Sequence, residues 1–169
     1  MVGRRTSQSG SVTIEFALAW TGLVAPLTFG IIFTAQLLWI WHSVTDWTRE
    51  GARYAATHCV QSSGDNVADY MRTNMPAMMD QEQFSNGPAT IAVTYYSKDP
   101  DSGQLVTLPC DTECSTSCVP DTVTVVVDNY QFAKFLGYLG LTPIQMPSFQ
   151  ASSPVESAGC DPEQQVCLP

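Results

Sequence analysis

The chain has 169 residues, is 44% hydrophobic and carries a formal net charge of −9. Because domains commonly run about 100 to 150 residues, this length leaves room for one small domain and one long helix. The acidic charge argues against binding to nucleic acid and against docking on anionic lipid through a basic patch.

An uncharged apolar run lies near the N-terminus. Phe16 to Trp41 contains 26 residues without an Asp, Glu, Lys or Arg. A helix of this run would be about 39 Å long, and crossing a bilayer takes only ~20 residues. A secretory signal peptide has a shorter apolar core, of about 7 to 15 residues. We therefore expect a transmembrane helix, kinked at Pro26 because proline removes a backbone donor.

One carboxylate stands at the start of this run. Glu15 immediately precedes the uncharged residues. An ionised group at the edge of hydrocarbon costs on the order of 2 to 3 kcal/mol and is usually kept for a partner. Residues 1–10 end in Gly10 and are short and basic, with Arg4 and Arg5, so we interpret them as a leader.

The order of these features carries a family resemblance. A basic leader, a glycine, a glutamate five residues later and an apolar helix are similar to the class III signal of type IV prepilins. Two blocks, SGSVTIEFALAWTGLVAPLTFGI at residues 9–31 and TREGARYAA at residues 48–56, resemble the TadE-like minor pilins, or pseudopilins, of tight-adherence (Flp) pilus systems. The resemblance covers roughly the first third of the chain.

This resemblance implies a processing site, an assembly residue and a set of partners. A prepilin peptidase would cut between Gly10 and Ser11, which makes Glu15 the fifth residue of the mature chain. The Glu15 carboxylate would then meet the new ammonium group of a neighbouring subunit. Further partners would be other pilin or pseudopilin subunits, the pilus assembly machinery of the inner membrane and membrane lipid.

Charge and cysteine placement predict the orientation in the membrane. Arg4 and Arg5 precede the apolar run without a nearby acid, whereas acidic and basic residues nearly cancel just after it. The positive-inside rule therefore places the N-terminus in the cytoplasm, as expected for a single-pass protein of the inner membrane. All six cysteines then lie in the periplasmic or extracellular part, where an even number predicts disulfides.

The rest of the chain predicts an α+β fold. The helix should continue past the membrane to about His58, and a second helix should begin near Asp65. Period-two patterns predict strands at Ala89–Ser97, Gln104–Leu108 and Thr122–Tyr130. A short helix is expected within Gln131–Gly140, and an edge strand within Ile144–Val155.

Three regions follow from these elements: a leader at residues 1–10, a transmembrane and assembly helix at 11–58 and an extracytoplasmic domain at 59–169. We expect that domain to be small and disulfide-bonded. It should contain one further helix and an antiparallel sheet of three or four strands.

The cysteines are candidates for disulfides rather than for a metal site. Three of them occur in CDTECSTSC, a spacing that could present thiolates on one face of a helix. Flanking prolines and an oxidising compartment favour disulfides, and six cysteines allow 15 pairings. We expect Cys160 to pair with Cys167 and Cys59 to pair with one of Cys110, Cys114 and Cys118. No metal or other cofactor is expected.

Two functions from different classes remain open. The favoured one is a structural minor pilin that a prepilin peptidase cleaves and that takes part in assembly of a tight-adherence pilus for surface attachment. The alternative is an uncleaved bitopic membrane protein whose disulfide-bonded outer domain binds a partner. An enzyme is not expected, because no catalytic motif is present and the histidines are only His42 and His58.

Overall fold

A computed structural model describes residues 9–59, 66–108, 115–116, 118–133, 136–137, 140–155, 157–161, 163–164 and 166–167. The chain divides into two compact units, Met1–Trp39 and Ile40–Pro169. Asp65, at which we predicted the start of a second helix, lies outside the described residues.

The first unit is helical throughout its described part. Helix α1 (Ser9–Ala19) leads into a π-helical turn at Trp20–Val24, and helix α2 (Ala25–Thr57) follows. In the π turn the N–H of Ala25 donates to the carbonyl of Trp20. Pro26 has no N–H and its ring crowds the preceding turn, which gives a physical reason for irregular helix at this point. The kink at Pro26 itself stays a prediction.

The helix of the first unit exposes most of its large apolar side chains. Over Gly10–Thr57 it is long and apolar enough to cross a membrane, and only 6% of its most apolar window is buried. A core helix of a soluble protein would be mostly buried. The exposed large apolar residues of this unit are Val12, Ile14, Phe16, Leu18, Trp20, Leu23, Val24, Leu27, Phe29, Ile31, Ile32, Leu38 and Trp39.

The second unit is built on a four-stranded antiparallel sheet. Its strands are β1 (Thr90–Lys98), β2 (Leu105–Thr107), β3 (Thr122–Asp128) and β6 (Phe149–Pro154), in the order β2-β1-β3-β6. Alternate residues of β3 point into the core, where Val123, Val125 and Val127 are fully buried. The predicted α+β architecture is confirmed, with its long N-terminal helix, its antiparallel sheet and its disulfide between Cys160 and Cys167.

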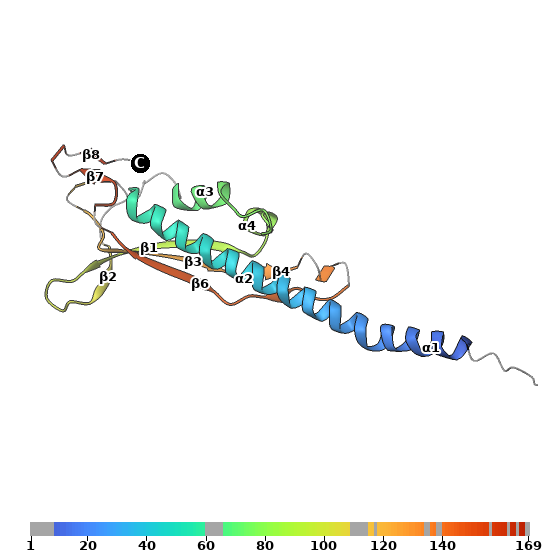
Figure 1. Cartoon of the computed structure of the whole chain (residues 1–169). Helices are drawn as coiled ribbons and strands as arrows, with labels where there is room; N and C mark the ends of the chain where they lie inside the picture. Colours follow the sequence, from blue (N-terminus) through green and yellow to red (C-terminus); the bar gives the residue numbers. More distant parts are fainter. Residues whose placement is uncertain are drawn as a thin grey trace, which may run out of the picture. The chain divides into compact units, whose positions relative to one another are not determined.

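The second half of α2 covers one face of this sheet (Figure 1). Its buried residues recur every three or four positions, as expected for one face of a helix: Ile40, Val44, Trp47, Thr48, Gly51, Ala52 and Ala55. Trp47 packs edge-on against Phe84 at 5.2 Å between ring centroids, and Phe84 stacks on Tyr130 at 5.6 Å. These rings join the helix to the end of β3.

Shorter elements complete the second unit. Helix α3 (Asn66–Thr73) and helix α4 (Glu82–Ser85) precede the sheet, and β7 (Cys160–Asp161) pairs with β8 (Val166–Cys167). The prediction of a helix from Gln131 is wrong at its start, because Gln131–Phe132 is strand β4 and pairs with β5 (Ile144–Gln145). Within the described part of residues 131–140, only residues 136–137 are helical.

Helices α2 and α3 approach each other at Gly51. A Cβ added at Gly51 would overlap the Sδ of Met71 and would lie 3.0 Å from its Cγ, and the Met71 side chain is fully buried. The indole Nε1 of Trp47 donates to the carbonyl of Met71 at 3.0 Å, which fixes this crossing. Gly51 therefore serves close packing between the helices.

Replacing Gly51 by alanine should lower the free energy of unfolding by about 1 to 3 kcal/mol, because the added methyl overpacks the helix crossing. Alanine has a higher helix propensity than glycine, by about 1 kcal/mol. A lower free energy of unfolding would therefore show that the cost of overpacking exceeds this gain. Urea unfolding of the full chain in detergent would measure this. Gly30→Ala is the control, since its Cβ would meet nothing within 4 Å. Equal or greater stability of Gly51→Ala would contradict the prediction.

Candidate functional site

The predicted processing and assembly residues lie together at the start of α1. Ser11 Oγ donates a hydrogen bond to Glu15 Oε1 at 3.1 Å, since residues four apart share a helix face. Gly10, Ser11 and Glu15 are all exposed, and a Cβ at Gly10 would meet nothing within 4 Å. This arrangement leaves the Gly10–Ser11 bond and the carboxylate accessible. Cleavage and pairing remain predictions.

Glu15 has no cation of its own along this helix. It is the only charged residue between Ser9 and Trp39, and that stretch contains no histidine. A carboxylate in hydrocarbon is costly unless a positive group or hydrogen-bond donors satisfy it. Within the stretch, the serine hydroxyl supplies one neutral donor. A positive partner must come from another segment or another molecule.

Polar groups gather where α2 enters the second unit. Asp46 lies 3.1 Å from Nε2 of His42 and 3.3 Å from Nη1 of Arg49. All three side chains are more than half exposed, so these pairs contribute little to stability. Trp41, which is 44% exposed, packs edge-on against Phe149 at 5.1 Å. The arrangement suits the water-facing boundary of an apolar helix.

Three cysteine sulfurs form a cluster just after α2. Cys160 and Cys167 form a disulfide, as predicted, and the Sγ atoms of Cys59, Cys160 and Cys167 all lie within 4.8 Å of one another. Thiolates at such distances are typical of metal sites, but here Cys59 is also disulfide-bonded. The three sulfurs therefore belong to disulfides and are not free thiolates that could hold a metal.

Of the three central cysteines, the structure describes only Cys118. Cys118 is disulfide-bonded as well, and the described residues contain no free cysteine. Cys110 and Cys114 lie outside the described residues. The pairing of Cys59 with one of the three central cysteines stays a prediction.

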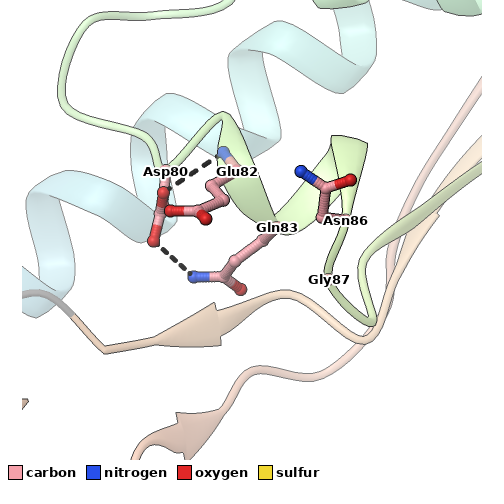
Figure 2. Close-up of a pocket in the computed structure, with 5 residues that line it drawn as sticks. All are labelled: Asp80, Glu82, Gln83, Asn86 and Gly87. Atoms are coloured by element: carbon pink, nitrogen blue, oxygen red, sulfur yellow. Dashed lines mark hydrogen bonds between the residues drawn. The ribbon is translucent and has the colours of Figure 1, made fainter.

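A small polar pocket opens beside α4 (Figure 2). It has a volume of about 260 Å³ and is lined by Asp80, Glu82, Gln83, Asn86 and Gly87. Asp80 accepts hydrogen bonds from the N–H of Glu82 at 3.3 Å and from Nε2 of Gln83 at 3.2 Å. The carboxylate thus holds the turn at the start of α4.

Gln83 is a structural residue that the sequence did not reveal. Its amide donates to the carbonyl of Gln131 at 2.8 Å and accepts from the N–H of Gln131 at 2.8 Å. The side chain therefore pairs with the backbone of β4 as a neighbouring strand would. Gly87 lies so close to Gln83 that an added Cβ would be 2.6 Å from its Cα. No local pattern marks Gln83, whereas Gly87 belongs to the turn sequence Ser-Asn-Gly-Pro at residues 85–88.

The shifted pKa values belong to structural groups. Burial raises the pKa of Tyr95 to about 12, and its hydroxyl has no hydrogen-bond partner in the described part of the chain. Burial also raises the pKa of Tyr130, whose hydroxyl accepts from the N–H of Asp80. The N–H of Asp101 and the hydroxyl of Ser102 lower the pKa of Asp99 in the turn between β1 and β2.

Fold and sites together define a class: one candidate membrane span followed by a small disulfide-bonded α+β domain. A family model described as TadE-like protein matches residues 10–53, so the resemblance is confirmed over that segment. The match suggests a protein associated with a tight-adherence (Tad) pilus. No curated protein and no solved structure matches the chain.

Replacing Gln83 by alanine should lower the free energy of unfolding by about 2 to 4 kcal/mol. The change leaves the half-buried backbone N–H and C=O of Gln131 without their partner, and a polar group left unsatisfied on burial costs about 1 to 3 kcal/mol. Gln81→Ala, at an exposed position next to α4, is the control and should change stability by less than about 0.5 kcal/mol. Equal effects of the two variants in urea unfolding would refute the pairing role.

Proposed function

We propose that this chain is a structural minor pilin, or pseudopilin, that a prepilin peptidase cleaves between Gly10 and Ser11. It would then take part in assembly of a tight-adherence (Flp) pilus for surface attachment. The observation that carries the proposal is the match to the TadE-like model, which begins at Gly10 and runs through the apolar helix. The proposed role is structural, and no catalysis is assigned to the chain.

The N-terminal geometry supports a role for cleavage. Cutting after Gly10 would create an α-ammonium group at Ser11, four residues from the only carboxylate of the apolar helix. Removing residues 1–10 would also take away two arginines, so the net charge would change from −9 to −11. The new ammonium is therefore the nearest available cation for a Glu15 carboxylate, in the same chain or in a neighbouring subunit.

Pairing between subunits would use both charges at once. An ammonium and a carboxylate that stay apart in hydrocarbon each carry a desolvation cost of several kcal/mol. A contact between them in a helix bundle would offset both costs and would fix the axial register of adjacent subunits. The proposed location is the inner membrane, with the N-terminus in the cytoplasm and the second unit in the periplasm or in a surface pilus.

The second candidate is an uncleaved bitopic membrane protein. It would keep residues 1–10 and use the outer domain to bind a partner. The disulfide-bonded cysteine cluster favours an extracytoplasmic domain in either case. The state of the N-terminus separates the two candidates.

Cleavage is tested by the intact mass and N-terminal sequence of the protein from its native membrane. With an active prepilin peptidase the chain should begin at Ser11, and without the enzyme it should keep residues 1–10. Gly10→Leu should block cleavage without disturbing the fold, because no atom lies within 4 Å of an added Cβ. Gly30→Ala, with equally open surroundings, is the control. A chain that keeps its leader in the presence of the peptidase would support the bitopic candidate.

Loss of the Glu15 charge should impair assembly but not membrane insertion. In Glu15→Gln the subunit ammonium would lose its partner, and we expect the fraction incorporated into pili to fall more than about tenfold. Glu15→Asp keeps the charge and should be incorporated into pili at an intermediate level. Glu163→Gln is the control, since it removes an exposed carboxylate of the C-terminal hairpin. Normal incorporation of Glu15→Gln, measured by immunoblotting of sheared pili, would exclude charge pairing.

A further inference from the structure

We infer that the two edges of the four-stranded sheet are complementary, so that β6 of one copy of this chain adds to β2 of a second copy. The inference concerns the second unit alone. It rests on the proposed function only in assuming that copies of the chain meet. Strand addition joins proteins through backbone hydrogen bonds, and the side chains alongside set its specificity.

Both outer strands have backbone groups that point away from the sheet. In an antiparallel pair, opposite residues alternate between hydrogen-bonded and non-hydrogen-bonded positions. The N–H of Asp99 donates to the carbonyl of Gln104, and the N–H of Leu108 donates to the carbonyl of Tyr95. Counting alternate positions along β2, the backbone groups of Leu105 and Thr107 therefore point outward.

The same count applies to β6. The N–H of Val155 donates to the carbonyl of Asp121, which makes Ser153 and Ala151 the residues hydrogen-bonded to β3. The backbone groups of Gln150 and Ser152 therefore point outward. No strand in the described part of the chain pairs with these outer sides of β2 and β6. Each edge offers two donors and two acceptors.

Neither edge strand carries a charged residue. Charged residues, especially lysine, commonly block unwanted pairing at sheet edges. Strand β2 is Leu-Val-Thr and β6 is Phe-Gln-Ala-Ser-Ser-Pro, so both are free of charge. Leu105 is 56% exposed and Val106 is 42% exposed. Pro154 lacks an N–H and would end the pairing at one side of β6.

Strand direction and charge select a second copy as the partner. Strands β1 and β6 are both antiparallel to β3, and β2 is antiparallel to β1, so β2 runs opposite to β6. A second copy in the same orientation therefore brings its β2 antiparallel to β6. Four backbone hydrogen bonds would form, between Leu105 and Ser152 and between Thr107 and Gln150. Neither strand carries a carboxylate, so the paired residues themselves bring no two carboxylates face to face.

Pairing of β2 with β6 uses two different edges, unlike a contact between two identical edges. A chain blocked at one edge can therefore still pair through the other. A chain blocked at β2 and a chain blocked at β6 should each fail to pair alone and should pair with each other.

The test uses the full chain in detergent micelles, with a benzophenone amino acid at position 106 and isotope labelling of one copy. Cross-links from position 106 to residues 149–154 of the other copy are expected. Ser152→Pro in the probe-bearing chain should lower their yield by on the order of tenfold, since proline removes an outward N–H. Adding an unprobed Thr107→Pro chain with an intact β6 should restore it.

Lysine variants keep the test decisive if a proline variant fails to fold. Gln150→Lys and Leu105→Lys should block the same two edges by charge. Leu141→Lys, at a position that is 54% exposed and outside both strands, should leave the yield unchanged. Cross-links from position 106 to β2 of the other copy, or no cross-links between copies, would overturn the inference. Cleavage at Ser11 is measured separately, so such a result would leave the proposed function standing.

Discussion

One helix has to satisfy two environments, and the rest of the structure depends on how it does so. Up to Trp39 most of its large apolar side chains are exposed, as a membrane span would require. From Ile40 onward one stripe of the helix is buried, and Gly51 within it lets helix α3 approach closely. Without this second half, the fully buried valines of β3 would lose the cover of α2. The candidate membrane span and the domain therefore both include helix α2, but they use different surfaces of it.

The elements that could be predicted from the sequence are those with a local cause. The uncharged run of Phe16 to Trp41 indicates its helix by length alone, and an unbroken run of β-branched residues in Thr122–Asp128 indicates strand β3. The turn residues between Lys98 and Gln104 predict the hairpin of β1 and β2. The short separation of Cys160 and Cys167 along the chain was sufficient to predict their disulfide. In each case the signal lies within a few residues of the feature.

The features that could not be predicted depend on residues far apart in the chain. Helical spacing of apolar residues suggested a helix from Gln131, but pairing with Ile144–Gln145 makes its first two residues a strand. The role of Gln83 depends on the backbone 48 residues later, and Gly87 matters because it lies against Gln83. The open edges of β2 and β6 follow from the strand order, which local propensity does not encode.

The distribution of charge limits where two copies of this chain can come into contact. The chain has 16 acidic and 7 basic residues, so copies of it repel one another wherever carboxylates face each other. Contacts between copies are least costly where charge is absent, as on the two sheet edges, or where opposite charges meet. Glu15 is the exception among the apolar residues, because its charge needs a cation that its own stretch lacks. In the proposed assembly, uncharged surfaces and one specific charge would hold a subunit to its neighbours, and the acidic remainder of its surface would disfavour other contacts.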